Sequence, residues 1–131
     1  MATHPEPTPL PRAEAPACDV EETPDAELMA VVPPPGETLD PDRLTYQKLR
    51  RDPEILTLIA MADRYLDTIG YTDHGLGHVA RVSQRAWRML KDLGVARRDA
   101  ELDAIADMLH DIGNMVHREK HPQAAALMAF P

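Results

Sequence analysis

The stretch that decides the fold runs from residue 72 to residue 113, as TDHGLGHVARVSQRAWRMLKDLG (72–94) and VARRDAELDAIADMLHDIG (95–113). In the first half, apolar residues recur at steps of three and four, the period of an amphipathic helix. They are Val79, Val82, Ala86, Met89 and Leu93. Thr72 or Asp73 is a candidate N-cap for this helix, and Gly94 is expected to end it.

The second half has the same periodicity. A helix is predicted to open at Asp99 or at the Arg97-Arg98 pair before it, and to end at Gly113. Its predicted inner face consists of Leu102, Ile105, Ala106 and Leu109. The short connection Gly94–Arg98 makes the two helices antiparallel neighbours.

This hairpin predicts a cluster of polar side chains at one end. At about 1.5 Å per residue, the chain travels roughly 22 Å from His78 to the turn and roughly 18 Å back to His110-Asp111. His78 and His110-Asp111 should therefore meet. The loop after Gly113 should return His121 to the same end.

Helices are also predicted on both sides of the hairpin. Asp52-Pro53 is a good N-cap and first-turn pair, and Gly70 is the matching stop. The apolar face between them is formed by Ile55, Ile59, Ala62, Leu66 and Ile69. A shorter helix is expected over Arg43–Arg51, and a last one over Gln123–Phe130 after Pro122. Because no useful strand-like alternation occurs, the predicted fold class is all-α.

Residues 1–42 differ in composition from the rest. They hold ten of the 13 prolines, and ten of the 22 acidic side chains against the single Arg12. Such a segment buries too little apolar surface to offset its ordering entropy, so we predict a disordered extension over 1–42 and a folded unit over 43–131. The extension carries a net charge of about −9 and the folded part about +1. A nearly neutral fold argues against nucleic acid as a partner, and the Arg50-Arg51 and Arg97-Arg98 doublets are typical of solvated helix faces.

The sequence shows no signal for export, membrane insertion or disulfide bonding. No secretory signal follows Met1, and the longest apolar run, Ala124–Phe130, is far too short for a membrane span. Cys18 is the only cysteine, which excludes a disulfide framework and a cysteine-based zinc site. We expect a cytoplasmic protein without a membrane partner.

The predicted cluster has the donor chemistry of a divalent metal site. Imidazoles and a carboxylate suit Mn, Fe, Co, Ni or Zn ions better than calcium. His78 and His121 lie near helix N-termini, where the positive dipole end disfavours imidazolium, and His110-Asp111 lies at a C-terminus, where a cation is favoured. Arg81, Arg118 and Lys120 are close enough in sequence to contact an anionic substrate. Taken singly, each residue also has an ordinary explanation, as a helix-end cap or a surface charge.

These residues resemble the HD-domain superfamily of metal-dependent phosphohydrolases. The first metal histidine of that family opens a helix as His-x-x-x-Val, matched by His78–Val82. Its name-giving pair ends a later helix, matched by Leu109-His110-Asp111-Ile112-Gly113. The resemblance covers about residues 43–130. It implies a helical bundle of the HD type and metal ligation by His78, His110 and Asp111. It also implies orientation of the attacking water by Asp111, and His121 as a ligand in two-metal members.

One ligand of that family has no counterpart here. The resemblance implies an aspartate on a later helix, but no aspartate follows Asp111 and Glu119 is the only later acid. The expected bundle is therefore incomplete at the C-terminus, relative to the family. A truncated or frameshifted reading frame and a self-associating fragment are equally open explanations.

Two functions of different classes follow from these observations. The first is a metal-dependent phosphohydrolase acting on a small phosphomonoester or nucleotide. It would use a divalent ion (Mn, Fe, Co, Ni, Zn or Mg), and weak or no activity is expected from the truncated chain. The second is a non-catalytic helical module that forms a homo-oligomer or binds a partner through an apolar face around Leu127, Met128 and Phe130.

Overall fold

The computed structural model describes residues 26–30 and 40–130, and every regular element in these ranges is helical. The elements are α1 (Ala26–Met29), α2 (Tyr46–Arg51), α3 (Pro53–Thr68), α4 (Leu76–Asp92), α5 (Arg97–Leu109), the 3₁₀ helix η1 (Ile112–Met115) and α6 (His121–Ala129). The all-α prediction is confirmed for this part of the chain. None of its helices is both long enough and apolar enough to span a bilayer.

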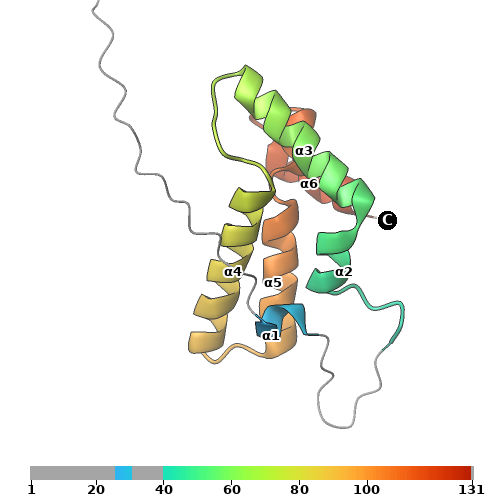
Figure 1. Ribbon diagram of the computed structural model, residues 1–131, viewed down its shortest axis with the longest axis vertical. Helices are drawn as coiled ribbons and strands as arrows, with labels where there is room; N and C mark the ends of the chain where they lie inside the picture. Colours follow the sequence, from blue (N-terminus) through green and yellow to red (C-terminus); the bar gives the residue numbers. More distant parts are fainter. Residues whose placement is uncertain (1–25, 31–39, 131) are drawn as a thin grey trace, which may run out of the picture.

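Helices α4 and α5 form the predicted antiparallel hairpin and lie side by side along their length (Figure 1). The turn between them depends on Gly94, whose φ of 76° lies in the left-handed region that glycine tolerates. The amide of Val95 then donates to the carbonyl of Leu90 at 3.0 Å and closes the end of α4. Helix α5 begins at Arg97, so the arginine pair opens this helix rather than Asp99.

The buried face of α4 differs from the predicted stripe. Val79 is buried as expected, but Met89 and Leu93 are 59% and 71% exposed. Trp87, Ser83 and Gln84 are buried instead. Trp87 has the largest apolar surface on this helix, so its burial is the most favourable. The helix face that buries Trp87 also carries Ser83 and Gln84 into the core.

The buried face of α5 is also rotated from its predicted position. Ile105 is buried as predicted, whereas Leu102 is 44% exposed and Ala106 is exposed. The buried positions are Ala100, Ala104, Ile105 and Met108. Ala100 and Ala104 have small side chains that fit into a closely packed interior, and the bulkier Leu102 lies on the outer side.

Helix α3 follows the sequence prediction more closely. Asp52 caps it, because its Oδ1 accepts hydrogen bonds from the amides of Glu54 (2.8 Å) and Ile55 (3.2 Å). Ile59, Ala62 and Leu66 are buried, whereas Ile69 lies beyond the helix and is 44% exposed. Helices α3 and α6 both pack against η1 at the end of the hairpin remote from the α4–α5 turn (Figure 1).

The disorder predicted for residues 1–42 does not hold at 26–30. Leu28 in α1 is 2% exposed and belongs to the main hydrophobic core. The guanidinium of Arg97 donates to the carbonyls of Glu27 (2.7 Å) and Ala30 (2.8 Å), and Lys91 pairs with the Glu27 carboxylate. Leu28 and these polar contacts anchor residues 26–30, although residues 1–42 are rich in proline and acidic residues. The prediction for 1–25 and 31–39 lies outside the described residues.

Candidate metal centre

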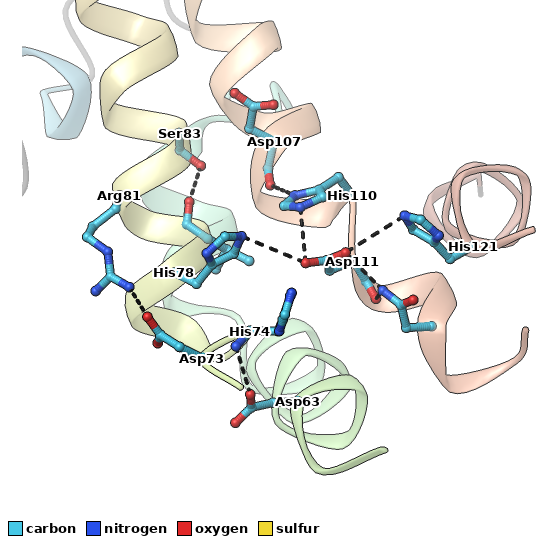
Figure 2. Close-up of polar contacts among 12 residues, drawn as sticks. Asp63, Asp73, His74, His78, Arg81, Ser83, Asp107, His110, Asp111 and His121 are labelled. Atoms are coloured by element: carbon cyan, nitrogen blue, oxygen red, sulfur yellow. Dashed lines mark hydrogen bonds and ion pairs between the residues drawn. The ribbon is translucent and has the colours of Figure 1, made fainter. Parts of the chain in front are cut away.

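His78, His110 and Asp111 lie close together at the end of the hairpin opposite its turn (Figure 2). His78 lies in the first turn of α4, and His110 is the C-cap of α5, directly before Asp111. One nitrogen or oxygen atom from each of the three lies within 4.8 Å of the others. The Nε2 atoms of His110 and His78 lie 3.0 Å and 3.9 Å from Asp111 Oδ2. The hairpin therefore brings these residues together, as its geometry predicted.

The helix boundaries around the cluster differ from the predicted ones. Helix α4 begins at Leu76 with Gly75 as N-cap, so neither Thr72 nor Asp73 caps it. Helix α5 ends at Leu109, four residues before the predicted stop at Gly113. The chain then turns through Asp111 into η1, and the Asp111 carbonyl accepts a hydrogen bond from the Asn114 amide at 3.0 Å. Ending α5 early frees Asp111 to turn into the cluster.

Asp111 is the centre of the cluster and is only 6% exposed. Asn114 holds it in place, because its Nδ2 donates to the Asp111 carbonyl (2.9 Å) and to Oδ1 (2.8 Å). The other carboxylate oxygen, Oδ2, is buried and accepts no well-directed hydrogen bond from the described residues. A buried anionic oxygen without a donor is costly unless a cation compensates it.

The His110 ring is oriented so that its Nε2 and Asp111 Oδ2 need a proton or a cation between them. Its Nδ1 lies 2.5 Å from the Asp107 carbonyl. Because a carbonyl only accepts, we assign the proton of the neutral ring to Nδ1. The lone pair of Nε2 then faces Asp111 Oδ2 at 3.0 Å. Two acceptors at this distance repel each other unless a proton or a metal ion lies between them. A backbone carbonyl that fixes the tautomer in this way is the usual arrangement behind a metal-bound histidine.

The pKa shifts agree with a cluster that attracts cations. The close contact with the Asp111 carboxylate raises the pKa of His110, against the opposing effect of burial. Burial alone would raise the pKa of Asp111, but the contacts with His110 and Asn114 outweigh it and hold that pKa below its usual value. Burial lowers the pKa of His78, which keeps this ring neutral and able to bind a metal.

His121 lies on the other side of Asp111 (Figure 2). Its Nε2 is 3.9 Å from Asp111 Oδ1, and its Nδ1 donates to the Arg118 carbonyl at 2.8 Å. Gly113 permits this placement, since a Cβ there would lie 2.0 Å from the His121 carbonyl oxygen and 2.5 Å from the Ala125 nitrogen. His121 is thus close to the cluster, but it lies outside the compact group of three.

The three basic residues expected to contact an anionic substrate differ in their surroundings. Arg81 pairs with Asp73 on the loop before its own helix. Arg118 donates to Asn114 Oδ1 at 3.0 Å, and its guanidinium lies 4.6 Å from the centre of the Tyr71 ring. Lys120 is exposed at the start of α6.

His74 also lies at the site, although no expectation from the sequence placed it there. Its ring centre lies 5.2 Å from that of His78, and its Nδ1 is buried without a hydrogen-bond partner. The signal available in the sequence was its position four residues before His78, between Asp73 and Gly75.

A cleft of about 380 Å³ lies beside the cluster, between α5 and α6. His110 and His121 line it, together with Leu109, Pro122 and alanines of both helices. It offers space for a ligand next to the candidate metal ligands.

The chain is similar to the uncharacterized protein MJ1020 of Methanocaldococcus jannaschii. The two are 28% identical over 103 residues, which cover 67% of this chain and 40% of that relative. The chain thus matches less than half the length of this curated relative. No protein-family model and no solved structure matches it.

Proposed function

We propose that the chain is an HD-type metal-dependent phosphohydrolase domain that acts on a small phosphomonoester or nucleotide. The observation that carries the proposal is the pair of acceptor atoms, His110 Nε2 and the buried Asp111 Oδ2, that face each other at 3.0 Å. His78 completes a set of three ligands for a divalent ion such as Mn²⁺, Fe²⁺ or Zn²⁺. His121 is the proposed ligand of a second ion.

Three protein ligands leave coordination positions open, which is the usual feature that separates catalytic sites from closed structural ones. A bound ion would polarise a phosphoryl oxygen and lower the pKa of its bound water. Asp111 is the proposed catalytic residue, because its buried Oδ2 can accept a hydrogen bond from the attacking water. Asn114 keeps that carboxylate in orientation through Oδ1. The open cleft beside His110 and His121 would admit the organic part of the substrate.

The first test is metal binding by the full chain. Calorimetric titration of metal-free protein with Mn²⁺ should show about one bound ion, and His110→Ala with Asp111→Ala should abolish the binding. His117→Ala with Glu119→Ala is the matched control, since it also removes one histidine and one carboxylate but both are exposed. Equal affinity of the wild type and the first double variant would rule out the proposed centre.

A second candidate function rests on the apolar surface of α6. Leu127 and Phe130 are 78% and 79% exposed. Such side chains can form a contact with another chain, as expected of a non-catalytic interaction module. Light scattering after size-exclusion chromatography should then show a concentration-dependent mass that Leu127→Ser lowers, whereas a monomer at all concentrations would count against this function.

A further inference from the structure

The loop between α3 and α4 is held firmly at the edge of the candidate centre. The Oδ1 atom of Asp63 on α3 accepts the backbone amide of His74 at 3.1 Å. Gly75 packs directly on the same carboxylate, since a Cβ at this position would lie 3.0 Å from Asp63 Oδ2. Asp73 adopts a φ of 59°, uncommon for a residue with a side chain, and pairs with Arg81 on α4. Contacts with two helices therefore fix the backbone on either side of His74.

This loop places the His74 ring beside the metal-ligand candidates. Figure 2 shows the ring extending from the loop toward Asp111, between Asp111 and Asp63. Its centre lies 5.2 Å from the His78 ring and 6.0 Å from the Tyr71 ring, which meets it edge-on. His74 is also near enough to contribute to the lowered pKa values of His78 and Asp111.

The surroundings of the ring determine which nitrogen carries the proton. Nδ1 is buried and has no partner, so a proton there would be a donor without an acceptor. A buried acceptor without a donor is the less costly of the two arrangements. The favoured neutral tautomer therefore has its proton on Nε2, the ring atom farther from the backbone.

Two of the cations near the cluster, Arg81 and Arg118, are already engaged, and Lys120 is exposed at the start of α6. Arg81 pairs with Asp73, and Arg118 with Asn114 and the Tyr71 ring. A phosphate ligand at the centre would carry several oxygen atoms, only some of which can reach a metal ion. His74 can supply a donor to one of the others.

We propose that His74 donates a hydrogen bond through Nε2 to a phosphoryl oxygen of the ligand held at this centre, and that Asp63 is the positioning residue that fixes it there. The inference rests on the proposed phosphohydrolase function and adds a substrate-binding residue to it. His74 contacts the substrate and not the metal ion, so its removal affects phosphate binding and leaves metal binding intact.

The test titrates Mn²⁺-loaded full-length protein with inorganic phosphate. His74→Phe keeps a ring against Tyr71 and His78 but removes both nitrogens, and it should weaken phosphate binding about tenfold or more, as expected for one hydrogen bond to a charged group. His74→Gln places an amide nitrogen near the position of Nε2 and should restore part of the affinity. His74→Asn places it near Nδ1 instead and should not. His117→Phe, at an exposed histidine, is the control.

Asp63 has its own pair of variants. Asp63→Ala removes the acceptor that holds the His74 backbone and should weaken phosphate binding in the same direction as His74→Phe. Asp63→Asn keeps an oxygen acceptor at Oδ1 and should retain most of the affinity. Combining Asp63→Ala with His74→Phe should add little to the effect of His74→Phe alone, since both act through the same hydrogen bond.

Each outcome separates this inference from the proposed function. Phosphate binding by His74→Phe as tight as that of the wild type overturns the inference, and so does a wild type that binds Mn²⁺ but not phosphate. Both results leave the metal centre intact. A loss of Mn²⁺ affinity in His74→Phe would make His74 a metal ligand and overturn its role as a phosphate donor. A wild type that binds no Mn²⁺ removes the proposed function itself, and this inference with it.

Discussion

Asp107 shows how a single carboxylate near the cluster can oppose folding. Burial raises the pKa of Asp107, the Asp103 carboxylate one turn earlier on α5 raises it further, and His110 partly opposes both. Because this pKa is higher in the folded chain than in the unfolded one, the contribution to stability is present below the unfolded value, about 3.9, and is lost as the pH rises through the folded value. At neutral pH the ionised side chain therefore destabilises the fold.

Asp107→Asn should accordingly raise the free energy of unfolding at pH 7 by about 0.3 kcal/mol, the usual size of one like-charge pair at this helix spacing. The gain should vanish near pH 4. Urea denaturation of metal-free protein at the two pH values measures it, and the backbone carbonyl that holds His110 is unchanged by the substitution. Asp99→Asn is the control of opposite sign, since it removes an acidic group from the first turn of α5. A gain that persists unchanged at pH 4 would contradict this explanation.

The residues of the site differ in how far the sequence could predict them. The placement of His78, His110 and Asp111 follows from two helix lengths and one short turn, which are local properties. His74 depends on Asp63, eleven residues earlier, and on the unusual backbone of Asp73, and neither contact leaves a periodic signal. Arg118 was predicted to face a substrate, and its contacts with Asn114 and Tyr71 could not be read from spacing.

At the scale of the helices, the sequence predicts which helices form and in what order. It does not predict which faces of α4 and α5 are buried. The caps at Asp52 and Gly94 are local and were identified correctly. The faces of α4 and α5 depend on which side chains fit together between them. A hydrophobicity pattern favoured Met89 and Leu93, and the packed helix buries Ser83 and Gln84 instead. Tertiary packing has outweighed the periodicity here.

That rotation leaves Gln84 in an unfavourable position. It is fully buried, and neither its Oε1 nor its Nε2 has a hydrogen-bond partner among the described residues. Gln84→Met keeps the length of the side chain and removes both polar atoms, so we expect the free energy of unfolding to rise by about 1 kcal/mol. Thermal and urea denaturation measure the change.

The neighbouring residue provides the control for that prediction. Ser83 is equally buried, but its hydroxyl donates to the Val79 carbonyl at 2.8 Å. Ser83→Ala removes a satisfied group and should not stabilise the protein. Should both substitutions raise the stability equally, the cause would be apolar burial in general and not the unpaired amide of Gln84.

At the scale of the whole molecule, the candidate metal centre and the attachment of α1 lie at opposite ends of the α4–α5 hairpin. The candidate centre lies at one end, against α3, η1 and α6. The turn lies at the other end, where α1 is attached through Arg97 and Lys91 (Figure 1). Stability and ligand binding should therefore respond to different substitutions.

Substitution of Leu28 tests whether stability and metal binding are independent of each other. Its side chain is 2% exposed in the main core, so Leu28→Ala should lower the free energy of unfolding by about 2–3 kcal/mol, as other buried leucines do. Leu127→Ala makes the same change at a side chain that is 78% exposed, and it should alter stability by less than about 0.5 kcal/mol. At 10 °C, where Leu28→Ala is expected to remain folded, it should bind Mn²⁺ as the wild type does, because the polar contacts of α1 with Lys91 and Arg97 lie at the remote end of the hairpin. A large loss of metal affinity in a folded Leu28→Ala variant would mean that the two ends are coupled through α4 and α5, whereas unchanged stability would mean that α1 does not anchor in the core.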